Sequence, residues 1–134
     1  MDTEAWKHDA DPAEFWAMVD LARRDYGAFT ASLEEADRRR LIRFTWWFEY
    51  FQSTLRDQPY VDTGDPALSE DALDDLADDV VGRGKAFYDD VLAHPERMPE
   101  KADFDDPAHD MQYDVHQAYF ARYGEVPPPY GHDY

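Results

Sequence analysis

Apolar residues recur every three or four positions along most of the chain, which is the spacing of one face of an α-helix. The first such run begins at Asp11-Pro12, a capping residue followed by a proline at the first helical position, and it ends at Gly27. Its apolar positions are Phe15, Val19, Ala22 and Tyr26. We therefore expect an amphipathic helix of about four turns between these limits.

The second run combines one apolar seam with aromatic residues beside it. Ser32 is in place to cap its start, and Glu35 follows three residues later, as in a capping box. The seam consists of Leu41, Phe44, Phe48, Phe51 and Leu55. Proline disfavours helical geometry in the residue before it, so this helix should end near residues 57–59. A break near Asp37 would divide the run into two helices.

Two further runs follow connections that are rich in proline, glycine and aspartate. Residues 57–68 form the first connection, after which a third helix begins at Ser69 and ends at His94-Pro95. Its buried face is Leu73, Leu76, Ala77, Val80, Gly84, Phe87, Val91 and Leu92. A fourth helix begins at Pro107 and ends at Gly124.

The pattern predicts an all-α protein, a compact bundle of four to five helices, because amphipathic helices need one another's apolar faces. We expect one domain over residues 1–134, with irregular tails at 1–10 and 125–134. No window approaches the roughly 18 apolar residues of a membrane span. The N-terminus is acidic and lacks the apolar region of a secretory signal, so we expect a cytoplasmic protein.

Negative charge is the most pronounced feature of the composition. The chain carries 31 Asp and Glu against 13 Lys and Arg, a formal net charge of −18. Such a surface repels nucleic acids and anionic membranes and attracts basic proteins. The same bias also fits adaptation to a salty cytoplasm or a GC-rich genome. The chain contains no cysteine, which excludes disulfides and thiolate chemistry.

The third run resembles a known family. Residues 69–98 are similar to a pattern that starts a helix with Ser-Asp-Asp and continues with Gly-Arg, a tyrosine and a proline; Gly84, Tyr88 and Pro95 match it directly. The aromatic pair Phe15-Trp16 adds to the likeness. This is the pattern of the bacterial domain-of-unknown-function family 4240. The resemblance covers residues 12–127 and implies a helical fold; it carries no reaction with it.

This chain departs from that pattern in places. The family's Gly-Gly-Cys turn before the serine is replaced by DQPYVDTGDPAL, and its arginine and tryptophan in the third helix are replaced by Ala77 and Asp79.

The candidate metal ligands are Asp106, His109 and His116. Their spacing can bring the two histidines to one side of a helix, two turns apart. Zinc-binding histidines on a helix are usually about four residues apart, so histidines on an acidic surface are the alternative interpretation.

The third helix carries a row of carboxylates at three-to-four spacing: Asp71, Asp75, Asp78 and Asp79. A solvated face is the simplest interpretation. Carboxylates about 5–6 Å apart can also imitate a row of phosphates and fill a basic groove.

The doublet Trp46-Trp47 is the other candidate for partner binding, together with Tyr50. Successive helical residues point about 100° apart, so both indoles can hardly enter one seam. We expect one of them at a margin, at a second interface or in a groove, since such aromatics often anchor contacts with a partner. The alternative is a central helix that is buried on two sides.

These features favour binding over catalysis. We expect an acidic helical protein-interaction module, similar in action to immunity proteins and antitoxins, that neutralises a basic protein as a monomer or homodimer and needs no cofactor. One alternative is a metal-dependent hydrolase or metal-binding protein that uses the Asp/His stretch at 105–116. The other is a nucleic-acid-mimicking inhibitor.

Overall fold

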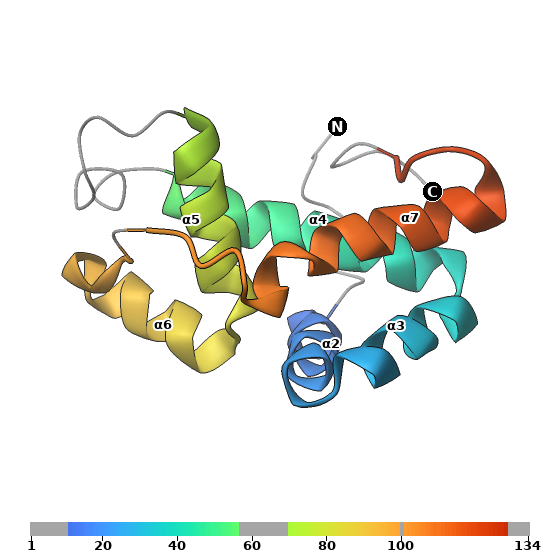
Figure 1. Cartoon of the computed structure of the whole chain (residues 1–134), viewed down its shortest axis with the longest axis horizontal. Helices are drawn as coiled ribbons and strands as arrows, with labels where there is room; N and C mark the ends of the chain where they lie inside the picture. Colours follow the sequence, from blue (N-terminus) through green and yellow to red (C-terminus); the bar gives the residue numbers. More distant parts are fainter. Residues whose placement is uncertain (1–10, 57–69, 100, 129–134) are drawn as a thin grey trace.

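The computed structural model describes residues 11–56, 70–99 and 101–128, and every regular element in these ranges is helical (Figure 1). The six α-helices are α2 (Pro12–Arg24), α3 (Tyr26–Glu35), α4 (Arg38–Leu55), α5 (Glu70–Gly82), α6 (Lys85–Ala93) and α7 (Met111–Tyr123). Two single 3₁₀ turns, η2 (Pro95–Arg97) and η3 (Pro107–His109), precede α7. The all-α prediction is confirmed, but six helices in these ranges exceed the four to five expected.

Asp25 accounts for one of the unexpected boundaries. Its backbone is extended, and its side chain accepts a hydrogen bond from the N–H of Ala28 at 3.1 Å. An aspartate in this position starts a new helix, so α2 ends before it and α3 runs through Gly27. The predictions that Gly27 ends a helix and that Ser32 caps one were therefore wrong. Ser32 lies inside α3.

The break near Asp37 is confirmed. The Asp37 side chain accepts a hydrogen bond from the N–H of Arg40 at 2.8 Å and caps α4. The predicted third helix also divides, because Gly84 adopts a φ of +108°, a region that residues with side chains avoid. α5 therefore ends at Gly82 and α6 begins at Lys85. Ser69 and the loop 57–68 lie outside the described residues.

Helix α4 is the centre of the molecule and packs against α2, α5 and α7 (Figure 1). Its buried aromatic residues meet those of α2: the ring of Phe15 lies 4.9 Å from that of Phe44, and the ring of Trp16 lies 4.8 Å from that of Phe51. Aromatic side chains bury large areas, so this cluster supplies much of the core. It explains how a chain with so much negative charge folds.

At the C-terminal end, α7 stops at Tyr123 because Gly124 takes the left-handed conformation, with φ of 71°. The prediction for this boundary is confirmed, and residues 125–128 are irregular as expected. The remaining tail residues, 1–10 and 129–134, lie outside the described part. No helix of the described ranges is both long and apolar enough to cross a membrane.

Candidate functional site

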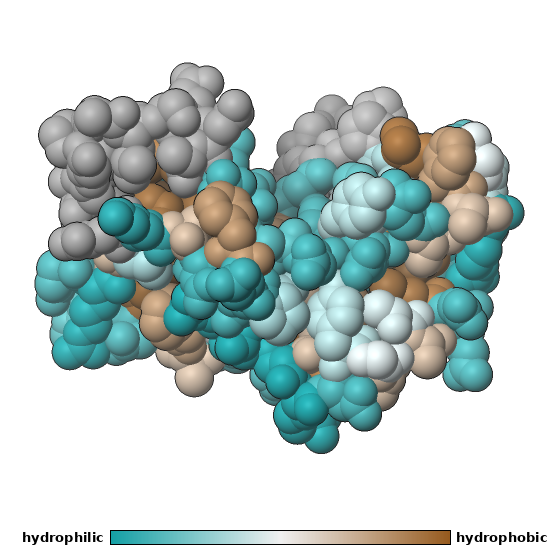
Figure 2. All heavy atoms as spheres, viewed as in Figure 1, coloured by the Kyte–Doolittle hydropathy of each residue, from teal (hydrophilic) through white to brown (hydrophobic). Residues whose placement is uncertain are grey.

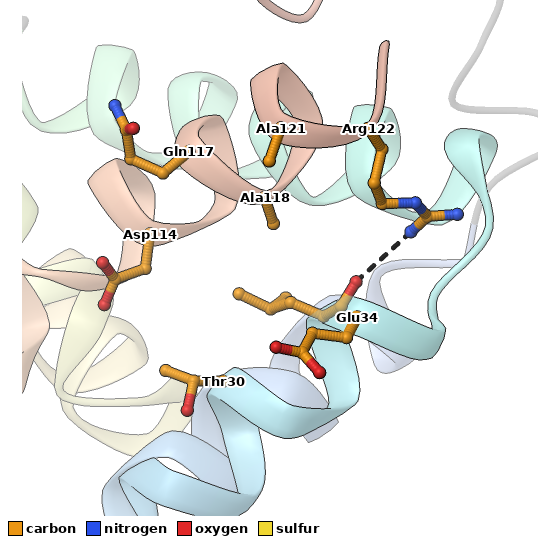
Figure 3. A pocket seen from close by; sticks show the side chains of 8 residues that line it. Thr30, Glu34, Asp114, Gln117, Ala118, Ala121 and Arg122 are labelled. Carbon is orange, nitrogen blue, oxygen red and sulfur yellow. Dashed lines mark hydrogen bonds between the residues drawn. The ribbon is translucent and has the colours of Figure 1, made fainter.

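Helices α3 and α7 lie side by side (Figure 1). Side chains of both helices line a groove. Its volume is about 490 Å³, within the range of small-ligand and peptide side-chain sites. The residues that line it are Thr30, Leu33, Glu34, Asp114, Gln117, Ala118, Ala121 and Arg122 (Figure 3). We call this the α3–α7 groove.

The apolar part of the groove exists because α7 presents small side chains there. Ala118 and Ala121 are three residues apart and therefore lie on the same side of the helix. Leu33 of α3 lies opposite them and is buried. Figure 2 shows hydrophobic residues between α3 and α7 on a face that is otherwise largely hydrophilic. Larger side chains at the two alanines would fill this space.

Two carboxylates lie on opposite sides of the groove, Glu34 on α3 and Asp114 on α7 (Figure 3). Glu34 is exposed and makes no hydrogen bond or ion pair with the described part of the chain. Asp114 accepts a hydrogen bond from the hydroxyl of Tyr26 at 2.5 Å. Burial, and then this bond to Asp114, raises the pKa of the Tyr26 hydroxyl, so it remains a donor at all ordinary pH values.

Arg122 brings a positive charge to the groove lining, but it already makes hydrogen bonds to the backbone of α3. Its guanidinium donates hydrogen bonds to the carbonyl of Leu33 at 3.3 Å and to that of Ala36. These carbonyls are at the C-terminal end of α3, where a positive charge is favourable. Arg122 therefore closes one end of the groove, and the two carboxylates keep the remainder negative.

The outer face of α7 beside the groove carries exposed aromatic residues. Tyr113 is 64% exposed and Phe120 is 53% exposed. They are seven residues apart, so they lie on one side of the helix about two turns apart. Gln117 lies between them and also lines the groove. Exposed aromatic side chains next to a cavity are typical of a contact surface.

Trp46 and Trp47 do not lie at the surface. Trp46 is 0% exposed and Trp47 is 6% exposed, and the indole N–H of Trp46 donates to the carbonyl of Pro128 at 2.9 Å. Tyr50 is only partly buried. Both indoles are therefore buried, as the alternative of a central helix predicts. α4 is buried on two sides, because α2 packs on one of its faces while α5 and α7 cover others.

The three described members of the carboxylate row of α5, Asp75, Asp78 and Asp79, are not fully solvated. Asp79 is fully buried and holds the guanidinium of Arg83 through two contacts of 3.1 Å. Asp78 accepts a hydrogen bond from the amide of Gln52 at 2.6 Å. Asp75 is partly buried, and the side chain of Asp71 lies outside what the structure describes.

Burial raises the pKa of Asp78 to about 7. The neighbouring charges of Asp75 and Asp74 contribute to this rise. The hydrogen bond from Gln52 acts in the opposite direction.

The candidate metal ligands are engaged separately. Asp106 binds both terminal nitrogens of Arg23, at 2.7 and 3.2 Å. Partial burial of Asp106 opposes ionisation, but the bonds from Arg23 and from the N–H of Ala108 outweigh it and lower the pKa. In the described ranges, no group of three or more His, Asp or Glu side chains is arranged to hold a metal ion.

The two histidines of that stretch face different surroundings. The Nε2 of His109 lies 3.6 Å from a carboxylate oxygen of Asp79, which is too far for a hydrogen bond. The Nε2 of His116 is buried and makes no hydrogen bond within the described part of the chain, and burial lowers the pKa of this imidazole.

The sequence patterns did not reveal the α3–α7 groove. Its two walls are far apart in the sequence, and the predicted helix end at Gly27 and helix start at Ser32 interrupt the segment that forms α3. One signal was available, since Ala118 and Ala121 are small residues three apart on a helix that otherwise carries large side chains.

A family model described as "Protein of unknown function (DUF4240)" matches residues 11–122. The chain belongs to this family. The match begins at the cap of α2 and ends one residue before the end of α7, so it includes every residue that lines the α3–α7 groove. No curated protein and no solved structure matches the chain. The resemblance seen in the third run and in Phe15-Trp16 is thereby confirmed.

Proposed function

We propose that this DUF4240 family member is an acidic protein-interaction module that binds a basic protein. The observation that carries the proposal is the α3–α7 groove, where an apolar floor lies between carboxylates on both sides. The whole chain carries a net charge of −18, which adds to the negative charge of this groove. Binding surfaces commonly combine an apolar centre with a charged rim in this way.

Electrostatics supports a basic partner in particular. A strongly acidic molecule attracts cationic proteins before contact and so raises their rate of association. Tyr113 and Phe120 then offer apolar area next to the groove. Long-range attraction and a local apolar contact are the two components that a specific complex of this kind needs.

The role that fits such a complex is inhibition. A small acidic protein that covers the basic surface of a partner blocks whatever that surface binds, as immunity proteins and antitoxins do. The alternatives have less support. Asp106 is held by Arg23, which does not favour a hydrolase metal site. The burial of Asp79 shortens the row of carboxylates that would imitate phosphates.

Affinity purification from the native host tests the proposal. The chain is immobilised and its captured proteins are identified at low and at high salt. The matched control is the double variant Tyr113→Ser/Phe120→Ser, which has the same net charge as the natural chain.

We expect the natural chain to retain a basic protein at low salt and release it at high salt, and the variant to retain less of it. Co-expression should then neutralise an activity of the captured protein. The proposal fails if the natural chain retains no basic protein above the level of the variant.

A further inference from the structure

We propose that the α3–α7 groove receives an arginine side chain from an amphipathic helix of the basic partner. This inference rests on the proposed function and assigns its point of contact. The guanidinium would lie between Glu34 and Asp114, and its aliphatic stem would lie on Ala118 and Ala121.

The carboxylates define the charge of the ligand. Glu34 makes no hydrogen bond or ion pair with the described residues, so its charge is available to a ligand. Asp114 is held in place by the hydroxyl of Tyr26 at 2.5 Å through one of its two oxygens. A carboxylate that is already fixed loses little freedom when it binds a cation, which favours affinity.

The groove floor defines the shape of the ligand. Ala118, Ala121 and Leu33 offer an apolar strip that suits the methylene stem of a long cationic side chain. Arginine fits better than lysine because its planar guanidinium can reach two carboxylates and is more weakly hydrated. A volume of about 490 Å³ exceeds what one such side chain fills, so a neighbouring apolar side chain of the same helix also enters.

A helix of a basic protein is a better occupant than a second copy of this chain. Two copies, each with a net charge of −18, would repel one another, and the carboxylates of the groove would add to that repulsion. A basic helix brings the complementary charge. Its apolar face would also contact Tyr113 and Phe120 on the outer side of α7.

The test uses the full chain and two synthetic helical peptides. One peptide has leucines on one face and arginines on the other, and its twin carries neutral citrulline at every arginine position. Binding is measured by calorimetry and located by amide chemical shifts. We expect the arginine peptide to bind at α3 and α7, and the citrulline twin to bind at least roughly tenfold more weakly, because charge-assisted hydrogen bonds are lost.

Variants of the chain test the location. Glu34→Gln should weaken the arginine peptide severalfold, whereas Glu35→Gln, on the same helix but outside the groove, should not. Ala121→Trp should block the groove, and Ala17→Trp, at an exposed position of α2, is its control. Both changed alanines are exposed, and thermal unfolding checks that each variant folds.

Three outcomes would overturn the inference: equal binding of the two peptides, indifference to Glu34→Gln and Ala121→Trp, or full competition by the free polyamine spermine, which would make the ligand a small cation. If a basic protein is captured from the host and its binding ignores Ala121→Trp, the groove assignment fails while the proposed function stands. If no basic protein is captured, the proposed function itself fails.

Discussion

A Cβ atom placed on Gly82 would lie 2.3 Å from the Cβ of Ala108 and 2.6 Å from its Cα. The end of α5 and the turn η3 therefore approach to a distance that only glycine allows. Arg23 holds the same junction from α2, since it donates to the carbonyl of Gly82 at 3.3 Å and binds Asp106. Three segments that are distant in sequence meet at this point.

Gly82→Ala should destabilise the protein by about 1–3 kcal/mol, because the added methyl group forces α5 away from the backbone of Ala108. Gly27→Ala is the control: its Cβ would meet a carboxylate oxygen of Asp25 at 3.5 Å, an ordinary contact, and the residue lies within α3. That change should be neutral or stabilising. Urea unfolding of both variants measures the difference, and similar free energies of unfolding would refute this view of the junction.

Asp79→Ala should cost about 1.5–3 kcal/mol of the free energy of unfolding, because it removes two charge-assisted hydrogen bonds to Arg83. The exposed pair of Lys85 and Asp89, 2.6 Å apart, provides the comparison. Asp89→Ala should cost less than about 1 kcal/mol, as is usual for surface ion pairs. If both variants lose the same free energy of unfolding in urea, the Asp79–Arg83 pair contributes no more to stability than an exposed ion pair.

Asp78 should make stability depend on pH. Its pKa is about 7 in the folded protein against an ordinary value of 3.8, so folding is favoured when it is protonated. Its contribution is complete below about pH 4 and is lost as the pH rises through 7. Asp78→Asn should abolish this dependence and stabilise the protein above pH 7 by on the order of 2 kcal/mol. If the free energy of unfolding depends on pH in the same way for the natural chain and for Asp78→Asn, then Asp78 is not the source of the dependence.

His116 should make stability depend on pH in the opposite direction. Burial lowers its pKa below the ordinary 6.5, so the unfolded chain takes up a proton that the folded chain excludes. Its contribution is complete above about pH 6.5 and is lost as the pH falls below that value. His116→Gln cannot be protonated in this range and should lose less stability than the natural chain on acidification. Thermal unfolding at neutral and mildly acidic pH compares the two proteins.

The helical pattern could be predicted where local chemistry is decisive. Asp37 and Gly124 mark helix ends in the sequence, and both ends are present in the structure. The prediction failed at Gly27 because Asp25 caps a new helix that runs through it, and at Ser32 because Asp37, not Ser32, caps the next helix.

The sites could not be predicted in the same way. The pattern of the third predicted helix favours a solvated position for Asp79, but packing against neighbouring elements buries it. The α3–α7 groove depends on which faces of two distant helices meet. Periodicity within one helix does not contain that information.

The decisive measurement is the dissociation constant of the complex with the captured basic protein over a range of salt concentrations. We predict that affinity falls steeply as salt rises, since the attraction between the acidic chain and its partner is screened. We also predict that Glu34→Gln weakens the complex at low salt. An affinity that is independent of salt and unchanged in this variant would contradict the proposal that the acidic groove binds a basic protein.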